Sequence, residues 1–222
     1  MNQVSRAGRS WTCAGLAIAL FGIPTVNLVF KLAGYTRHDD AAIVAREFTI
    51  LALVGLLLWI VRSGERLPLS SIGLRRQPIG PAILWTLAAL AAFAAALAFC
   101  LGLLLPALGL TYGSQGAPAV SLGVTTLIVM RAGLAEEVFY RGYAIERIEA
   151  LTGSRPIAAV VPVVLFAGFH FSQGIAGVLI ALFVGAAATA MYLWKRNLAI
   201  LIAAHFTLDF VPNVLIPLIA GM

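Results

Sequence analysis

Hydrophobic residues occur along this chain in runs long enough to cross a lipid bilayer. A helix rises 1.5 Å per residue, so about 20 apolar residues span the roughly 30 Å of hydrocarbon. Runs of that length, separated by charges or by glycine and proline, predict about seven transmembrane helices, and an eighth or a re-entrant helix stays open. The runs are approximately residues 11–32, 42–61, 81–105, 122–143, 157–171, 174–194 and 198–220.

The composition supports a membrane protein. Of 222 residues, 61% are hydrophobic and 11% are charged, whereas about 25% of the residues in soluble domains are charged. The net charge of +6 comes from basic residues scattered in loops, without the basic and aromatic stripe of a nucleic-acid site, so no nucleic-acid partner is expected. No linker or repeat interrupts the chain. We expect an all-α polytopic membrane protein, a single bundle and a single membrane domain over 1–222.

The basic residues also predict an orientation. Lys and Arg are enriched in cytoplasmic loops, and they gather here in every second loop. These residues are Arg62, Arg66, Arg75 and Arg76 in one loop, Arg147 and Arg155 in another, and Lys195 and Arg196 in a third. The pattern predicts a cytoplasmic N-terminus.

Two adjacent carboxylates, Glu136 and Glu137, lie in the apolar run 122–143, and Arg141 follows Glu137 by four residues. Each charge at a bilayer centre costs roughly 2.5–3.5 kcal/mol on insertion scales, so it marks a functional site by default. Residues four apart share a helix face, so Glu137 can pair with Arg141 and leave Glu136 without that cation. A desolvated glutamate without a cation suits a general base. The alternative is a charge cluster that only holds helices together.

Other charged positions have less defined partners. Arg131 precedes Glu136 by about one and a half turns, and its expected partner is Glu136, Asp209 or the membrane interface. Arg46 and Glu47 open the second run, where we expect an interfacial turn.

Polar residues also stand in the later apolar runs. His205 and Asp209 are four residues apart, so the carboxylate can hold the imidazole in one orientation. His170 stands near the end of the run 157–171, where a functional histidine and an interfacial histidine that reaches water are both open. Gly168 beside it predicts close approach of another backbone.

Three motifs in this order resemble a known family, the CPBP intramembrane proteases, also called the CAAX-protease or Abi family, which includes Rce1-like CAAX prenyl endopeptidases. The motifs are Glu136-Glu137 with Arg141, Phe166 with His170, and His205 with Asp209, on successive membrane helices. The resemblance covers about residues 122–209. It implies a CPBP-like catalytic core over 121–222, and it leaves 1–120 as variable N-terminal helices without a matching motif.

The resemblance implies an intramembrane glutamic endopeptidase. Glu136 and His170 would activate a water for attack on the scissile carbonyl, while His205 and Asp209 would stabilise the oxyanion. Family members often carry Asn at the last position, and an amide donates hydrogen bonds that an ionised carboxylate does not. Asp209 would therefore be protonated, orient His205, or help to hold a metal.

The resemblance also implies a setting for the reaction. Glu137 and Arg141 would form a positioning pair. The partners would be membrane lipid and a membrane-tethered or lipidated peptide substrate, cleaved near its C-terminus. The expected location is a bacterial inner membrane.

Zinc is an alternative to a metal-free site. Two histidines and carboxylates form a normal open zinc set, here Glu136, His170, His205 and Asp209. The sequence has no HExxH motif, and the family resemblance implies no required ion, so no cofactor is the first expectation.

Two other function classes remain open. An ion-coupled transporter would use glutamate, histidine and aspartate in its bundle, but an internal repeat is missing from the sequence. A non-catalytic membrane binding or immunity protein would need none of the catalytic positions, yet all of them are filled.

Overall fold

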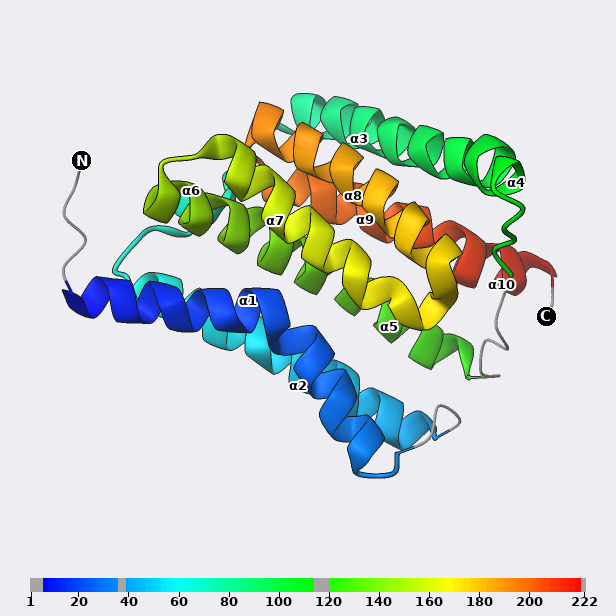
Figure 1. The fold of residues 1–222 in the computed structure, drawn as a ribbon, viewed down its shortest axis with the longest axis horizontal. Coiled ribbons are helices and arrows are strands. Elements are labelled where there is room, and N and C mark those ends of the chain that lie inside the picture. The colour runs from blue at the N-terminus through cyan, green and yellow to red at the C-terminus, as the bar shows by residue number, and fades with distance from the viewer. Residues whose placement is uncertain (1–5, 36–38, 114–119, 221–222) are drawn as a thin grey trace.

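The computed structural model describes residues 6–35, 39–113 and 120–220, and all regular secondary structure in these residues is helical. The N-terminal half forms three long helical stretches (Figure 1). They are α1 (Arg6–Leu32), α2 (Asp40–Trp59) with η1 (Ile60–Gly64), and α3 (Ile79–Phe99) with η3 (Cys100–Leu104) and α4 (Leu105–Ala107). The short η2 (Leu69–Ile72) lies between the second and third stretches.

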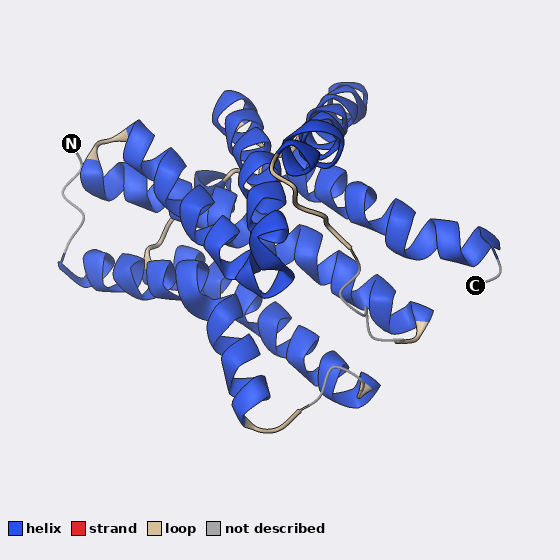
Figure 2. Cartoon of the chain, turned by 45° about the vertical axis from the view of Figure 1, so that its right-hand side comes forward, coloured by secondary structure: helices blue, strands red, loops and turns tan. Residues whose placement is uncertain are grey.

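The C-terminal half forms three more stretches, and Figure 2 shows the helices of both halves joined by loops. They are α5 (Leu122–Glu136) with η4 (Glu137–Ile145) and α6 (Glu146–Thr152), α7 (Arg155–Gly168) with η5 (Phe169–Gln173) and α8 (Gly174–Lys195), and α9 (Leu198–Phe210) with η6 (Val211–Leu215) and α10 (Ile216–Ala220).

Five of these stretches are long and apolar enough to cross a membrane. They are Gly8–Leu32, Asp40–Gly64, Ile79–Ala107, Arg155–Lys195 and Leu198–Ala220. The chain is therefore a helical, multi-pass membrane protein.

The five candidate stretches are fewer than the seven spans predicted. The predicted runs 157–171 and 174–194 belong to one helical stretch, Arg155–Lys195, which reverses direction at η5 so that α7 and α8 lie side by side (Figure 1). Gly174 permits this reversal because its φ of 76° is readily adopted only by glycine. The predicted run 122–143 falls outside the five because its charged residues, among them Arg131 and Arg141, lower its apolar character.

The stretch α5–η4–α6 is packed on several sides. α5 contacts α2 and α9, η4 contacts α1, α7 and α9, and α3 packs against α8 and α9. Helices of both halves of the chain therefore surround the segment that carries Glu136 and Glu137.

The two ends of the bundle differ in charge. Figure 1 places the start of α1, α6 and the start of α9 at one end, and α4 and α10 at the other. The predicted basic loops, which contain Arg147, Arg155 and Arg196, belong to the first end. The structure thus agrees with the alternation of basic loops, and the side of the membrane stays a prediction.

A buried carboxylate fastens the first helices to the core at this basic end. Glu65 is 3% exposed and lies 2.7 Å from Arg147 of α6. It also accepts hydrogen bonds from Thr12 of α1 and Tyr143 of η4, each at 2.8 Å. Because every one of these donors comes from a different element, Glu65 stabilises the packing of α1 against η4 and α6.

Candidate active site

The neighbouring carboxylates Glu136 and Glu137 face different surroundings. α5 ends at Glu136, and the wider π-helical turn η4 begins at Glu137. The side chain of Glu136 is 15% exposed, whereas that of Glu137 is 1% exposed. Short π-helical segments inside helices are frequent at functional sites, where they change the direction of side chains.

Glu137 is the centre of a buried polar cluster. Its Oε1 accepts a hydrogen bond from Arg141 Nη1 at 3.0 Å and lies 2.8 Å from Nδ1 of His205. Arg141 also donates to the carbonyl of Gly185 at 3.3 Å, and its guanidinium lies 4.4 Å from the ring centroid of Phe166. The pairing of Glu137 with Arg141 agrees with their spacing. The contact with His205 links η4 to α9 and has no signal in local sequence.

His205 is held from two sides. Its Nδ1 faces Glu137, and its Nε2 lies 3.4 Å from Oδ2 of Asp209. The spacing of His205 and Asp209 along α9 predicts the second contact. Together the two carboxylates fix the orientation of the ring.

A glycine allows the helices that carry Glu137 and His205 to approach. A Cβ atom at Gly133 of α5 would lie 3.0 Å from the backbone nitrogen of Phe206 and 3.2 Å from its Cα. Backbone atoms cannot move aside as a side chain can. Gly133 therefore sets the distance between α5 and α9, four residues before Glu137 on the same face.

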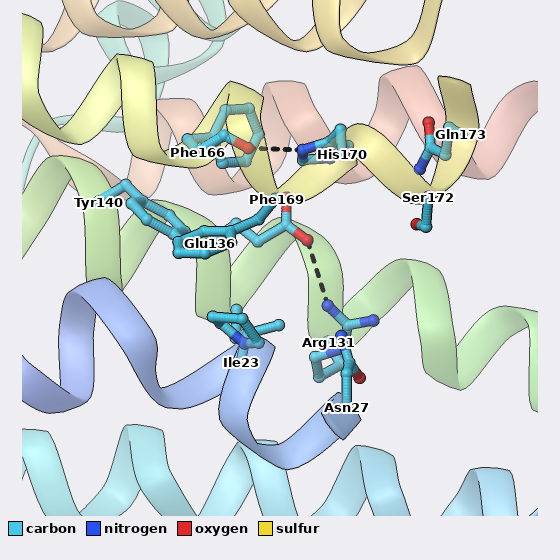
Figure 3. Close-up of a pocket in the computed structure, with 11 residues that line it drawn as sticks. Ile23, Asn27, Arg131, Glu136, Tyr140, Phe166, Phe169, His170, Ser172 and Gln173 are labelled. Carbon is cyan, nitrogen blue, oxygen red and sulfur yellow. Dashed lines mark hydrogen bonds and ion pairs between the residues drawn. The ribbon is translucent and has the colours of Figure 1, made fainter. Parts of the chain in front are cut away.

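Glu136 and His170 line one pocket of about 180 Å³, drawn in Figure 3. The walls come from α1, from α5 with η4, and from the end of α7 with η5. The lining residues are Ile23, Pro24, Asn27, Arg131, Glu136, Tyr140, Phe166, Phe169, His170, Ser172 and Gln173. Figure 3 shows Glu136 and His170 on facing sides of this space, with Arg131 and Asn27 at one side. The pocket therefore brings two of the predicted catalytic residues together, while His205 and Asp209 are not among its lining residues.

Glu136 has a cation partner, contrary to the prediction of a carboxylate without one. Nη1 of Arg131 lies 3.2 Å from Oε1 of Glu136 (Figure 3). The prediction of a base without a cation rested on the spacing to Arg141, whereas Arg131 reaches Glu136 from about one and a half turns earlier in α5. Of the partners considered for Arg131, Glu136 is the one that the structure supplies.

Glu47 is a residue of this site that the sequence analysis missed. It was predicted at the membrane interface with Arg46, but its side chain is 0% exposed and contacts Nε of Arg131 from α2. The signal that could have identified it is the general one, a carboxylate inside an apolar run.

His170 is oriented by its own helix. Its Nδ1 lies 2.7 Å from the carbonyl oxygen of Phe166, four residues earlier. A carbonyl only accepts hydrogen bonds, so the neutral ring carries its proton on Nδ1 and keeps Nε2 able to accept a proton. This places a proton acceptor in the pocket beside Glu136.

The prediction for Gly168 is wrong. A Cβ atom there would have no neighbour within 4 Å, so Gly168 faces open space and mediates no close backbone contact. Its position in an apolar run could not reveal which face of α7 meets another helix.

A loop residue lies close to the same region. Tyr112, which follows α4, donates a hydrogen bond at 3.1 Å to Gln173, a residue of the pocket wall. Burial, and then the charge of Asp209, raise the pKa of Tyr112. The phenol therefore keeps its proton and its donor role through neutral pH.

The described residues do not form a zinc site. No group of three or more histidine, cysteine, aspartate or glutamate side chains in them could hold a metal ion. Both ring nitrogens of His205 face carboxylates, and Nδ1 of His170 faces a carbonyl. We therefore derive no step through a metal.

Comparison with known proteins gives one match. Residues 117–211 match the family described as type II CAAX prenyl endopeptidase, Rce1-like. None of the curated proteins and none of the solved structures that were compared matches the chain. The matched segment includes the six predicted site residues, and Glu47 lies outside it.

Proposed function

We propose that this protein is an intramembrane protease that cleaves near the C-terminus of its substrate, because residues 117–211 match the Rce1-like family of type II CAAX prenyl endopeptidases, which are proteases. The substrate would be a membrane-tethered or lipidated protein or peptide. The observation that carries the catalytic proposal is the pocket that Glu136 shares with His170.

In the proposed reaction, Glu136 acts as the general base on a water in the pocket. The water oxygen forms a bond to the scissile carbonyl carbon while its proton moves to the Glu136 carboxylate. The proton is then delivered to the leaving amine as the carbon–nitrogen bond breaks. Nε2 of His170 accepts a second hydrogen bond from the same water and orients it.

His205 can stabilise the oxyanion only by a hydrogen bond from Nε2, because Nδ1 faces Glu137. This atom is 3.4 Å from Asp209, a longer contact than the 2.8 Å from Nδ1 to Glu137. We propose that Nε2 exchanges Asp209 for the oxyanion when substrate is bound, while Glu137 keeps hold of Nδ1. Asp209 orients the ring until substrate binds and is not itself a donor to the substrate.

The wall of the pocket combines polar groups with aromatic rings. Phe166, Phe169 and Tyr140 are among its lining residues, and the pocket lies within a bundle of apolar helices. A peptide held at the membrane by a lipid or an apolar segment can present its bond there without exposing the site to bulk water.

The decisive experiment is cleavage of a membrane-tethered peptide by detergent-purified protein. We expect Glu136→Gln to lower kcat by about 10³-fold or more, because the base is lost while the shape of the side chain is kept. Glu149→Gln is the matched control, since Glu149 pairs with Arg196 and is not among the residues that line the pocket.

The same cleavage assay tests whether the reaction depends on a metal. Cleavage that persists with a zinc chelator supports the glutamate mechanism, and loss on chelation that zinc restores would contradict it. Binding of the peptide without any cleavage would indicate a capture protein instead.

A further inference from the structure

We propose that Glu47 of α2 is a positioning residue of the active site, which holds Arg131 and through it sets the place of Glu136. The inference rests on the proposed function, in which Glu136 is the base. It extends the site into the part of the chain that lies outside the family match at 117–211.

Glu47 is a carboxylate at a buried position, where a charge requires compensating partners. Its side chain is 0% exposed, and it lies in the apolar stretch Asp40–Gly64. An uncompensated carboxylate there would be costly, so its partners determine what it does.

Each of the two carboxylate oxygens of Glu47 contacts a different arginine. Oε1 accepts from Nε and Nη2 of Arg46, at 2.9 and 2.6 Å. Oε2 accepts from Nε of Arg131. The carboxylate is thus fully engaged on both sides, and its orientation is determined.

Arg131 in turn links two carboxylates. Its Nε faces Glu47, and its Nη1 lies 3.2 Å from Glu136. The guanidinium is a rigid planar group, so fixing one nitrogen also fixes where the others point. Charges alternate along the chain of Arg46, Glu47, Arg131 and Glu136, so each is offset by a neighbour.

Because Arg131 contacts both Glu47 and Glu136, Glu47 affects the position of Glu136, the proposed base. Arg131 gives Glu136 one nitrogen at 3.2 Å, because Glu47 occupies Nε. Without Glu47, the guanidinium is free to turn its paired nitrogens onto Glu136 or to leave it. Either movement displaces the carboxylate from the water that it must deprotonate.

A purely structural role predicts a different result. If Glu47 only joins α2 to α5, its loss lowers stability and leaves the turnover of the folded protein unchanged. Glu65 provides the comparison, because it is a carboxylate of similar burial, paired at 2.7 Å with Arg147 and absent from the pocket wall.

The test measures kcat and KM for Glu47→Gln, Arg131→Gln, the double variant and Glu65→Gln. Glu47→Gln should lower kcat by about 10- to 100-fold, as loss of a supporting hydrogen-bond partner does, with KM little changed. The double variant should match Arg131→Gln, since Glu47 acts through Arg131. Glu47→Asp should recover part of the activity, and Glu65→Gln should lower stability without lowering kcat.

Two results would overturn the inference. One is a wild-type kcat for Glu47→Gln, and the other is a double variant in which the two losses multiply. If wild type cleaves and Glu136→Gln does not, the proposed function survives either result.

A measurement without substrate covers the case in which no peptide is cleaved. Phenylglyoxal modification of Arg131, followed by mass spectrometry, should be faster in Glu47→Gln than in wild type, because the guanidinium is no longer held by Glu47. In Glu65→Gln the increase should appear at Arg147 only. An unchanged rate at Arg131 would show that Glu47 does not hold it.

Discussion

Glu136 and Glu137 are adjacent in sequence but meet different charges. Glu137 is enclosed with Arg141 and His205, and its Oε2 has no hydrogen-bond partner among the described residues. Glu136 borders the pocket and shares Arg131 with Glu47. A buried ion pair adds little net stability, but removal of one member leaves the other charge uncompensated. The two residues should therefore differ in what their loss does.

Glu137→Gln should destabilise the protein by about 3–5 kcal/mol, because it leaves the guanidinium of Arg141, 2% exposed, without a counter-charge. Glu136→Gln should have a much smaller effect, since Arg131 keeps its contact with Glu47. The measurement is unfolding by SDS in mixed micelles, followed by circular dichroism. Equal unfolding midpoints for the two variants would contradict this assignment of roles.

Packing of the helices brings the side chains of the site together. α5 and α9 approach at Gly133, and this contact brings Glu137 of η4 within 2.8 Å of His205. The bend of α1 at Pro24 acts on the other side of the site. Proline removes a backbone donor and kinks a helix, and Pro24 together with Ile23 and Asn27 forms one wall of the pocket.

Gly133→Ala should separate α5 from α9. The added Cβ would lie 3.0 Å from a backbone atom of Phe206, so the helices must shift by a few tenths of an ångström. We expect a loss of about 1–3 kcal/mol in stability and a lower kcat, as for other overpacked sites. The measurements are SDS unfolding and peptide cleavage.

The control for this prediction is in the same helix. Gly123→Ala places its Cβ in open space and should be neutral or stabilising by about 0.5–1 kcal/mol. If both alanine variants behave alike, the close contact at Gly133 has no role.

At the scale of the whole molecule, the basic loops are separated from η5 of the pocket wall. The basic loops gather at the end of the bundle that holds α6, whereas η5 and the loop after α4 lie at the opposite end (Figure 1). The charge rule puts the basic end in the cytoplasm, so it places η5 on the other side of the membrane.

Cysteine labelling tests this orientation. In a background with Cys13 and Cys100 replaced by alanine, Leu108→Cys should react with a membrane-impermeant maleimide in intact cells. Leu151→Cys should react only after permeabilisation. The native leucines are 55% and 46% exposed, so both positions are accessible once the reagent reaches them. The reverse pattern would place the N-terminus outside.

The sequence by itself determined the class of the protein and two of its polar contacts. Apolar runs of membrane length predict helices because a backbone in lipid must bond within its own segment. Spacings of four residues predicted the pairs Glu137–Arg141 and His205–Asp209, since neighbours on one helix depend only on helix geometry. The three motifs also indicated the family that matches residues 117–211.

Only the tertiary structure decided which helices meet. The contacts of His205 with Glu137 and of Arg131 with Glu47 join residues 68 and 84 positions apart. The structure also makes the predicted runs 157–171 and 174–194 one continuous helical stretch, Arg155–Lys195. Lipid and the protein interior are both apolar, so membrane helices show little hydrophobic periodicity. The pattern of hydrophobic residues therefore does not identify which face of a helix is buried.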